Sequence, residues 1–406
     1  MKGPFFDECI IRIHRPTMPA KPTNVQLARM NGNFRAYFTL NPDFLIVGAG
    51  VMGLSAAWEL AATGACVTII ERGEAPGRES SWAGGGILSA LLPWEYPQAV
   101  TSLIDLSTAL YPAWTDELHA VSAIDTEYRK TGVLVLPPFD ECSARTWKST
   151  HDVSADLICA RDVGGPFCAD ERALWLRDAA QVRNPRLMKA LLAASKRQGV
   201  QILTGTEVRE IQVAGDRVAR VITGRTTFTP GSVVVAAGAW SGKLVEGLGT
   251  TLHIFPVRGQ MLLYQADPDR LKTILLRNDY YVIPRNDGHI LVGSTKEYVG
   301  FDPRTTVTAG RELEKAAARL FPPLAHLAPV AHWAGLRPGS PDNIPTIARH
   351  PRIQNLYANA GHYRYGLTMA PGSARVLANL ILGRDQPIDV SPYDWAVESV
   401  PNQTRR

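Results

Sequence analysis

One short segment near the start of the chain restricts the possible folds more than any other. The apolar run Phe44–Val47 is followed at once by the glycine turn 48–53. A small-residue stretch of helical composition, 54–63, comes next, and a second apolar run, Val67–Ile70, ends in Glu71. Strand, glycine turn, helix, strand and acid in this order predict a βαβ unit with parallel strands.

The glycine turn has the chemistry of a dinucleotide-binding site. Gly48 permits the tight turn, Gly50 lets the backbone approach a pyrophosphate, and Gly53 lets the helix pack on the strand. The helix N-terminus offers free N–H groups to the anion. Glu71 ends the second strand, where its carboxylate can accept hydrogen bonds from a ribose and disfavours the 2′-phosphate of NADP. The turn does not separate FAD from NAD, although its position favours FAD.

The length and the alternation of patterns predict two interleaved domains. A chain of 406 residues exceeds one simple core. Stretches of α/β character alternate with hairpins, such as 280–284 with 289–293 around the turn 286–288. We therefore expect a mixed α/β fold in which a Rossmann-like domain interleaves with an antiparallel-sheet substrate domain. The expected segments are 43–95, 185–255 and 333–390 for the first domain, and 96–184 and 256–332 for the second.

Composition excludes several classes of function. The net charge is only +5 and the 43 basic residues are dispersed, so no basic stripe predicts a nucleic-acid partner. No apolar run approaches the ~18 residues that span a membrane. Five cysteines without a CxxC pair or nearby histidine cluster predict neither disulfides nor a metal site, and they fit a cytoplasmic protein.

The first 42 residues differ from the rest of the chain. They carry scattered arginine and proline and no apolar run typical of a secretion signal, and acidic residues argue against a transit peptide. We expect residues 1–42 to be a poorly ordered tail, or to lie upstream of a usual start at Met18 or Met30.

A second glycine-rich segment, 78–86, follows the acid. Three successive glycines, Gly84 to Gly86, leave room for a flat ligand or a close backbone approach. Trp82 and the apolar run directly after the glycines argue against a plain flexible loop.

Several linked motifs carry a resemblance to a known family. In order along the chain they are GAGVMG, ERG, GRESSWAGGGILS, VRNPRL, VVVAAGAWSG, HILVGSTKE, HWAGLRPGSPDNIP and GHYRYGL. Together they resemble the glycine oxidase family of thiamine biosynthesis, within the D-amino-acid oxidase superfamily of flavoproteins, over roughly residues 43 to 395.

The resemblance implies FAD as cofactor and assigns residues to it. Besides the glycines and acid of the βαβ unit, the implied contacts are Val51, Met52, Arg72, Glu79, Ser80, Gly84, Gly85, Gly86, Val208, His362, Tyr363, Arg364, Tyr365, Gly366, Leu367 and Thr368. Related sarcosine oxidases attach FAD through a late cysteine. The last cysteine here is Cys168, so we expect FAD to be bound non-covalently.

The resemblance also implies how a substrate binds. Arg337 would hold a carboxylate through a bidentate pair, Tyr281 would add a hydroxyl, and Arg364 would lie near both flavin and substrate. A surface ion pair for Arg337, a core role for Tyr281 and a structural role for Arg364 are the alternatives. One departure from the family is Tyr365, where an asparagine is frequent; its ring could reshape the pocket or face away.

The expected activity is oxidative deamination of glycine, and of sarcosine or small D-amino acids, to the imine and oxoacid with formation of H2O2. No acid or base side chain is needed, because hydride passes to the flavin. The imine would feed thiazole synthesis, and the family implies a homotetramer. A dehydrogenase that passes electrons to a quinone or carrier, and a non-catalytic flavin-binding subunit, stay open as alternatives.

Overall fold

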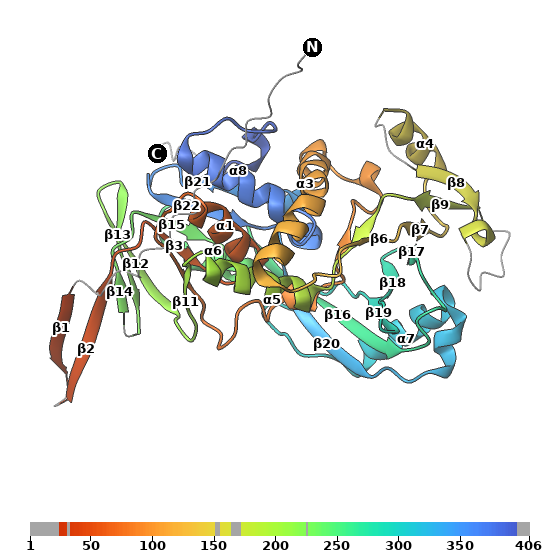
Figure 1. The fold of residues 1–406 in the computed structure, drawn as a ribbon, viewed down its shortest axis with the longest axis horizontal. Helices are drawn as coiled ribbons and strands as arrows, with labels where there is room; N and C mark the ends of the chain where they lie inside the picture. The colour runs from red at the N-terminus through yellow and green to blue at the C-terminus, as the bar shows by residue number, and fades with distance from the viewer. Residues whose placement is uncertain (1–23, 31–32, 151–154, 164–171, 225, 396–406) are drawn as a thin grey trace, which may run out of the picture.

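The computed structural model of the chain describes residues 24–30, 33–150, 155–163, 172–224 and 226–395. Its elements form two regions, one built on a mostly parallel sheet flanked by helices and one on a large, mostly antiparallel sheet (Figure 1). This arrangement confirms the expected mixed α/β fold.

The first region contains a six-stranded sheet that is buried on both faces. All neighbouring strands are parallel except the β21–β22 pair at one edge. Along β3, Ile46 packs toward one face while Leu45 and Val47 pack toward the other, and all three are buried. Burial on both faces explains why these strands read as continuous apolar runs. In spatial order the strands are β11 (Gln201–Leu203), β4 (Val67–Ile70), β3 (Phe44–Val47), β15 (Ser232–Val235), β22 (Leu356–Ala360) and β21 (Thr346–Arg349).

Helices cover one face of this sheet, and a second sheet covers the other. The helices are α1 (Val51–Ala61), α3 (Gln98–Ser122), α5 (Asn184–Arg197) and α8 (Ala370–Leu382). The second sheet is five-stranded, in the order β1 (Asn24–Met30), β2 (Asn33–Leu40), β14 (Thr226–Phe228), β13 (Arg217–Thr223) and β12 (Val208–Ala214). Val221 and Phe228 of this sheet share an apolar cluster with Leu45.

Two strands lie in the N-terminal segment, where we expected a poorly ordered tail. Strands β1 and β2 form an antiparallel hairpin, and β2 pairs in parallel with β14, which extends the five-stranded sheet (Figure 1). The pairing joins segments far apart in the chain, so a local reading of the sequence could not find it. Residues 1–23 and 31–32 lie outside the described residues.

The second region contains an eight-stranded sheet, and one helix covers one of its faces. Helix α7 (Val307–Leu320) packs Leu313 on Val282 and Val292, while Tyr281 and Met261 belong to a cluster on the opposite face. Strand alternation therefore turns Tyr281 away from α7. In spatial order the strands are β20 (Ala331–Gly339), β16 (Phe255–Gln265), β19 (His289–Gly293), β18 (Tyr280–Pro284), β17 (Ile274–Arg277), β7 (Val133–Val135), β9 (Arg172–Leu176) and β8 (Ala155–Cys159).

The other described sheet and α-helices are shorter. A three-stranded sheet holds β5 (Ile87–Leu88), β10 (Ala180–Gln181) and β6 (Arg129–Lys130), and the remaining α-helices of the described residues are α2 (Ser80–Ala83), α4 (Glu141–Thr150) and α6 (Ser241–Leu244).

Two elements lie outside the domains that we expected for them. Helix α3 falls within 96–184, yet it packs on α5 and α8 of the first region. Strand β20 lies almost wholly within 333–390, yet it pairs with β16 at the edge of the eight-stranded sheet. The chain crosses between the regions several times, and the crossings carry no mark in local composition.

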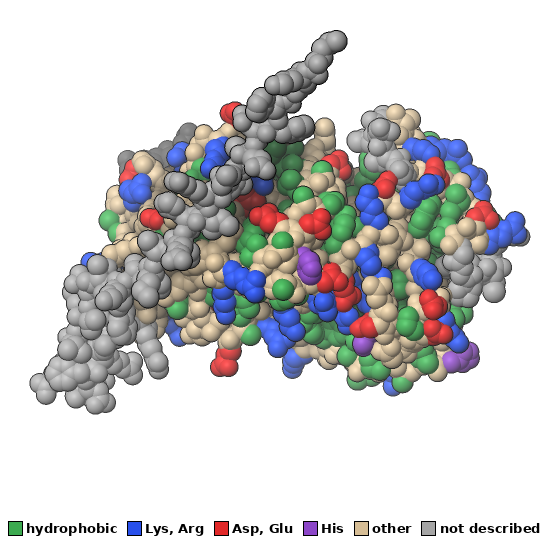
Figure 2. Space-filling view, in the orientation of Figure 1, with side chains coloured by type: hydrophobic (Ala, Val, Ile, Leu, Met, Phe, Trp, Pro, Cys, Tyr) green, Lys and Arg blue, Asp and Glu red, His purple; other side chains and the backbone are tan. Residues whose placement is uncertain are grey.

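The surface and the helix lengths add two observations. Basic and acidic side chains are interspersed on the face shown in Figure 2. Within the described part of the chain, no helix is both long and apolar enough to cross a membrane.

Candidate active site

A cavity between the two regions brings the expected site residues together. Its volume is about 460 Å³, within the usual range of ligand-binding clefts. Of the residues expected from the sequence, every one except Gly53 lines it: Gly48, Gly50, Val51, Met52, Glu71, Arg72, Glu79, Ser80, Gly84, Gly85, Gly86, Val208, Tyr281, Arg337, His362, Tyr363, Arg364, Tyr365, Gly366, Leu367 and Thr368.

The glycine turn forms a close-packed cradle at the start of α1. Gly48 has φ +108°, and a Cβ there would lie 2.4 Å from the carbonyl oxygen of Ala236. A Cβ on Gly53 would lie 1.9 Å from the carbonyl oxygen of Gly48, so Gly53 packs behind the turn. Helix α1 has neither a side-chain cap at Gly50 nor an acid in its first turn. Its positive end is therefore available to an anion.

Glu71 is held directly beside this turn. Its Oε2 accepts a hydrogen bond of 2.9 Å from the backbone N–H of Ala49, and its Oε1 accepts one of 2.8 Å from that of Gly73. These two bonds fix the carboxylate at the end of β4, where its remaining lone pairs can accept ribose hydroxyls.

Three cavity residues that the sequence did not single out lie near this end. The Arg72 guanidinium stacks 3.6 Å above the ring of Trp240 and forms a 3.2 Å ion pair with Glu79. Trp240 and Lys243 both line the cavity. Ser81 accepts a 2.9 Å hydrogen bond from the N–H of Val51 at the start of α1. Trp240 stood in a quoted motif, but its contact with Arg72 depends on the pairing of β15 with β3.

The second glycine-rich segment touches the opposite region at close range. A Cβ on Gly85 would lie 2.9 Å from Cδ1 of Ile283 and 3.0 Å from Cε2 of Tyr281. Gly86 has φ +76°, and a Cβ there would lie 2.2 Å from the carbonyl oxygen of Val182. Glycine is needed here because the segment is pressed between β18 and the backbone before α5.

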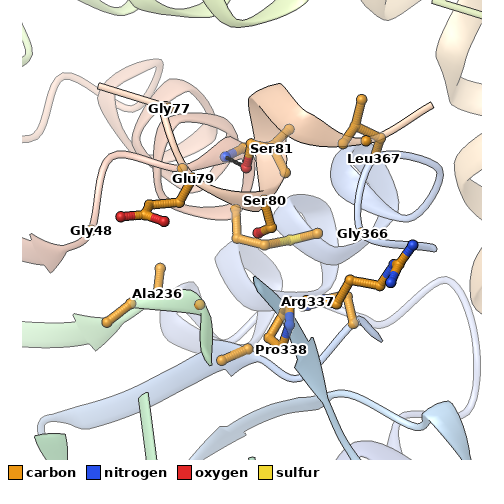
Figure 3. Close-up of a pocket in the computed structure, with 18 of the residues that line it drawn as sticks. Gly48, Gly77, Glu79, Ser80, Ser81, Ala236, Arg337, Pro338, Gly366 and Leu367 are labelled. Atoms are coloured by element: carbon orange, nitrogen blue, oxygen red, sulfur yellow. Dashed lines mark hydrogen bonds between the residues drawn. The ribbon is translucent and has the colours of Figure 1, made fainter. Parts of the chain in front are cut away.

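Arg337 is a partly buried cation held in one orientation. Its Nη2 donates to Oγ of Ser294 at 2.6 Å and its Nη1 donates to the carbonyl oxygen of Thr295 at 3.1 Å. The guanidinium lies on Gly259, where a Cβ would be 2.1 Å from Nη1. Burial lowers the pKa of Arg337 below its ordinary value. Figure 3 shows Arg337 and Pro338 across the cavity from Ser80 and Ser81.

Tyr281 and Arg364 lie in the same cavity, but each already has a contact. The buried Tyr281 hydroxyl is 3.5 Å from Sδ of Met261. Nη1 of Arg364 lies 3.0 Å from a carboxylate oxygen of Asp279. Burial opposes the charge of Arg364, but neighbouring groups that include Asp279 raise its pKa above the ordinary value.

The segment 362–368 contributes buried rings without an acid–base group near neutrality. His362 is buried, with Nε2 2.9 Å from Oγ of Ser373, and burial lowers its pKa to about 3. The Tyr365 ring is also buried. Its hydroxyl donates to the carbonyl oxygen of Leu91 at 3.2 Å, and its ring meets Tyr96 edge-on at 5.2 Å between centroids. Tyr365 therefore lines the cavity and anchors the segment after β5.

The cavity fits a ligand that brings its own polar groups. Both side-chain polar atoms of Asn359 and Nδ1 of His362 are buried without a hydrogen-bond partner among the described residues. Unsatisfied buried groups of this kind are costly in a protein interior. A dinucleotide with a pyrophosphate, a ribose and a flat ring matches the turn, the acid and these orphaned atoms.

Comparison with known proteins agrees with this geometry. Residues 43–380 match the family model described as FAD dependent oxidoreductase. The chain belongs to this family. A relative named glycine oxidase, from Pseudomonas aeruginosa, is 45% identical over 86% of this chain and 97% of its own length. The crystal structure of glycine oxidase from Geobacillus kaustophilus superposes with a TM-score of 0.82 at 28% identity, over 88% of this chain and 99% of that one.

A third relative is longer than this chain. A protein from Synechocystis named bifunctional protein ThiO/ThiG is 32% identical over 84% of this chain and 51% of its own length. Membership of the family makes FAD the cofactor and confirms that the protein is an FAD-dependent oxidoreductase.

Proposed function

We propose that this enzyme oxidises glycine, with sarcosine and small D-amino acids as further substrates, to the imine and then the oxoacid, and that dioxygen is reduced to H2O2. The observation that carries the proposal is Arg337, a cation oriented by two hydrogen bonds in the cavity that also contains the dinucleotide turn. The relatives named glycine oxidase support the same substrate.

Arg337 binds the substrate carboxylate in this proposal. A guanidinium has five N–H donors, and the two bonds to Ser294 and Thr295 leave donors for a bidentate pair with a carboxylate. Tyr281, whose ring touches the glycine segment, would donate its hydroxyl to the same carboxylate and limit its rotation. Two anchors orient the Cα–H bond, which supplies much of the rate in reactions of this kind.

When bound, FAD supplies the acceptor for the hydride and the route of the electrons to dioxygen. Neither His362 nor Tyr363, both of which line the cavity, exchanges a proton near neutrality. Burial keeps His362 neutral, with a pKa of about 3, and burial together with a hydrogen bond to Tyr298 raises the pKa of Tyr363 to about 12. The substrate amine therefore loses its proton to water, and activity rises with pH as the amine becomes neutral.

A metabolic role follows from the product. The imine formed from glycine would supply thiazole synthesis for thiamine, a role that the resemblance implies and that the relative named ThiO/ThiG supports.

The test is anaerobic mixing of the purified holoenzyme with glycine, sarcosine, D-alanine and D-proline, followed by admission of air. We expect glycine to bleach the visible flavin absorbance, and air to restore it with one H2O2 per flavin. Bleaching without H2O2 would show a dehydrogenase with another acceptor, and no bleaching by any of the four would refute an amino-acid oxidase. Arg337→Lys should bind glycine more weakly than the wild type and Arg337→Ala more weakly still.

A further inference from the structure

A second arginine, Arg285, is buried behind the flavin cavity and does not line it. It follows β18 and is 7% exposed. Its Nη1 donates to Oε1 of Gln181 at 2.6 Å and to the carbonyl oxygen of Val182 at 2.9 Å, and its Nη2 donates to the carbonyl oxygen of Gly85 at 2.7 Å. An arginine side chain is almost never fully buried unless it is paired.

The bond to Gly85 connects this charge to the cavity through one peptide. Gly85 and Gly86 both line the cavity, and the peptide bond between them is trans. In a trans peptide the C=O and the N–H point in opposite directions. The carbonyl of Gly85 points at Arg285, so the N–H of Gly86 points away from Arg285. Both glycines line the cavity, and we therefore take this N–H to face the cavity side of the segment.

We propose that Arg285 is a positioning residue that acts on the flavin through this peptide: its charge aligns and polarises the Gly85–Gly86 amide, so that the amide dipole presents its positive end to the flavin and raises the flavin reduction potential. A fixed amide dipole stabilises the negative charge that builds on the ring during reduction. The proposal requires bound FAD but does not depend on which amino acid is the substrate.

The surroundings of Arg285 leave it charged. Burial lowers its pKa to about 10, and among its neighbours Glu127 and Asp287 favour the charge while Arg183 and Arg129 oppose it. Arg183 forms ion pairs of 3.2 Å with Glu127 and 2.6 Å with Asp287. The two carboxylates are thus shared with other arginines, and Arg285 itself makes its close contacts with neutral oxygen atoms.

The variants that test the proposal separate charge from shape. Arg285→Lys keeps the charge, and Arg285→Gln removes it while keeping a donor for the carbonyl of Gly85. Gln181→Glu leaves Arg285 in place but replaces the neutral oxygen that Nη1 contacts with a carboxylate, which offsets the positive charge of Arg285. Arg183→Gln is the matched control, because it removes a cation from the same cluster without touching the glycine segment.

The measurements are the midpoint potential of the bound flavin and the dissociation constant of sulfite, a probe that binds more tightly to electron-poor flavins. For Arg285→Gln and Gln181→Glu we expect a midpoint potential lower by about 30 mV, which is a tenfold change in the two-electron reduction equilibrium, and weaker binding of sulfite. Arg285→Lys and Arg183→Gln should stay near the wild type. FAD content and the affinity of the apoprotein for FAD are measured on the same samples.

Each outcome decides the proposal. Potentials that follow the charge at position 285, with FAD content unchanged, support it. A wild-type potential in both Arg285→Gln and Gln181→Glu overturns it, as does an equal shift in Arg183→Gln. If Arg285→Gln fails to retain FAD, Gln181→Glu still decides, because it leaves all three hydrogen-bonding positions occupied. These readouts need no substrate, so they succeed or fail independently of glycine oxidation.

Discussion

Replacement of Gly259 by alanine should displace Arg337 without removing it. Gly259 lies in β16 opposite Gly335 of β20, where the extended backbone tolerates alanine. The added Cβ would lie 2.1 Å from Nη1, 2.2 Å from Nη2 and 2.3 Å from Cζ of Arg337. Carbon and nitrogen atoms pack at about 3.5 Å, so the guanidinium must move by roughly 1 Å or more.

This displacement predicts a large kinetic effect. It disrupts the bonds of Arg337 to Ser294 and Thr295 and moves the carboxylate anchor away from its position. A misplacement of about 1 Å can cost on the order of 100-fold in rate, so we expect kcat/KM for glycine to fall by about that factor. Binding of glycolate, which has the carboxylate but no amine, should weaken in parallel.

The matched control for Gly259→Ala is Gly339→Ala in the same pair of strands. A Cβ on Gly339 would lie 2.6 Å from the ring of Phe255, its ladder partner, which is 39% exposed and can turn aside. Steady-state oxygen consumption and the perturbation of the flavin spectrum by glycolate measure both variants. If Gly259→Ala matched Gly339→Ala in kcat/KM and in glycolate affinity, Arg337 would not be the carboxylate anchor.

Three further predictions concern the cofactor and pH. Gly48→Ala forces a left-handed backbone and a 2.4 Å contact with the carbonyl of Ala236, so the protein should purify without FAD, as absorbance will show. Glu71→Gln places an amide group against the N–H of Ala49 or of Gly73 and should weaken FAD binding by about tenfold, measured by titration of the apoprotein. Burial lowers the pKa of His362 to about 3 from 6.5, so the unfolded state binds the proton first as pH falls. The free energy of unfolding therefore falls as the pH drops from 6.5 toward 3, and at about pH 5 it has fallen by roughly 2 kcal/mol. His362→Asn should lack this part of the pH dependence in urea unfolding, and an unchanged dependence of the unfolding free energy on pH would contradict the assignment.

Much of the cofactor end of the site could be predicted because its signals are local. The strand β3, the turn at Gly48, the helix α1 and Glu71 at the end of β4 lie within one short stretch of sequence, and each residue type has its own physical reason. The hairpin β18–β19 around Gly288 was likewise predictable from alternation and turn chemistry.

The substrate end was predictable only through resemblance. No local sequence feature distinguishes Tyr281 from Tyr280. In the structure, Tyr280 lies on the face of the sheet that helix α7 covers, and Tyr281 lies on the opposite face. The sequence also left both interpretations of Tyr365 open, because its hydroxyl donates to the carbonyl of Leu91, which is 274 residues away along the chain.

The sequence by itself determined the dinucleotide turn, the acid beside it and the class of fold, because those features depend on neighbours in the chain. Tertiary structure alone decided which sheet β20 joins, where α3 packs and which groups surround Arg337 and Arg285. The physical reason is that each of these contacts joins segments far apart in sequence. Their energy comes from burial and from hydrogen bonds that exist only after the two regions have packed together.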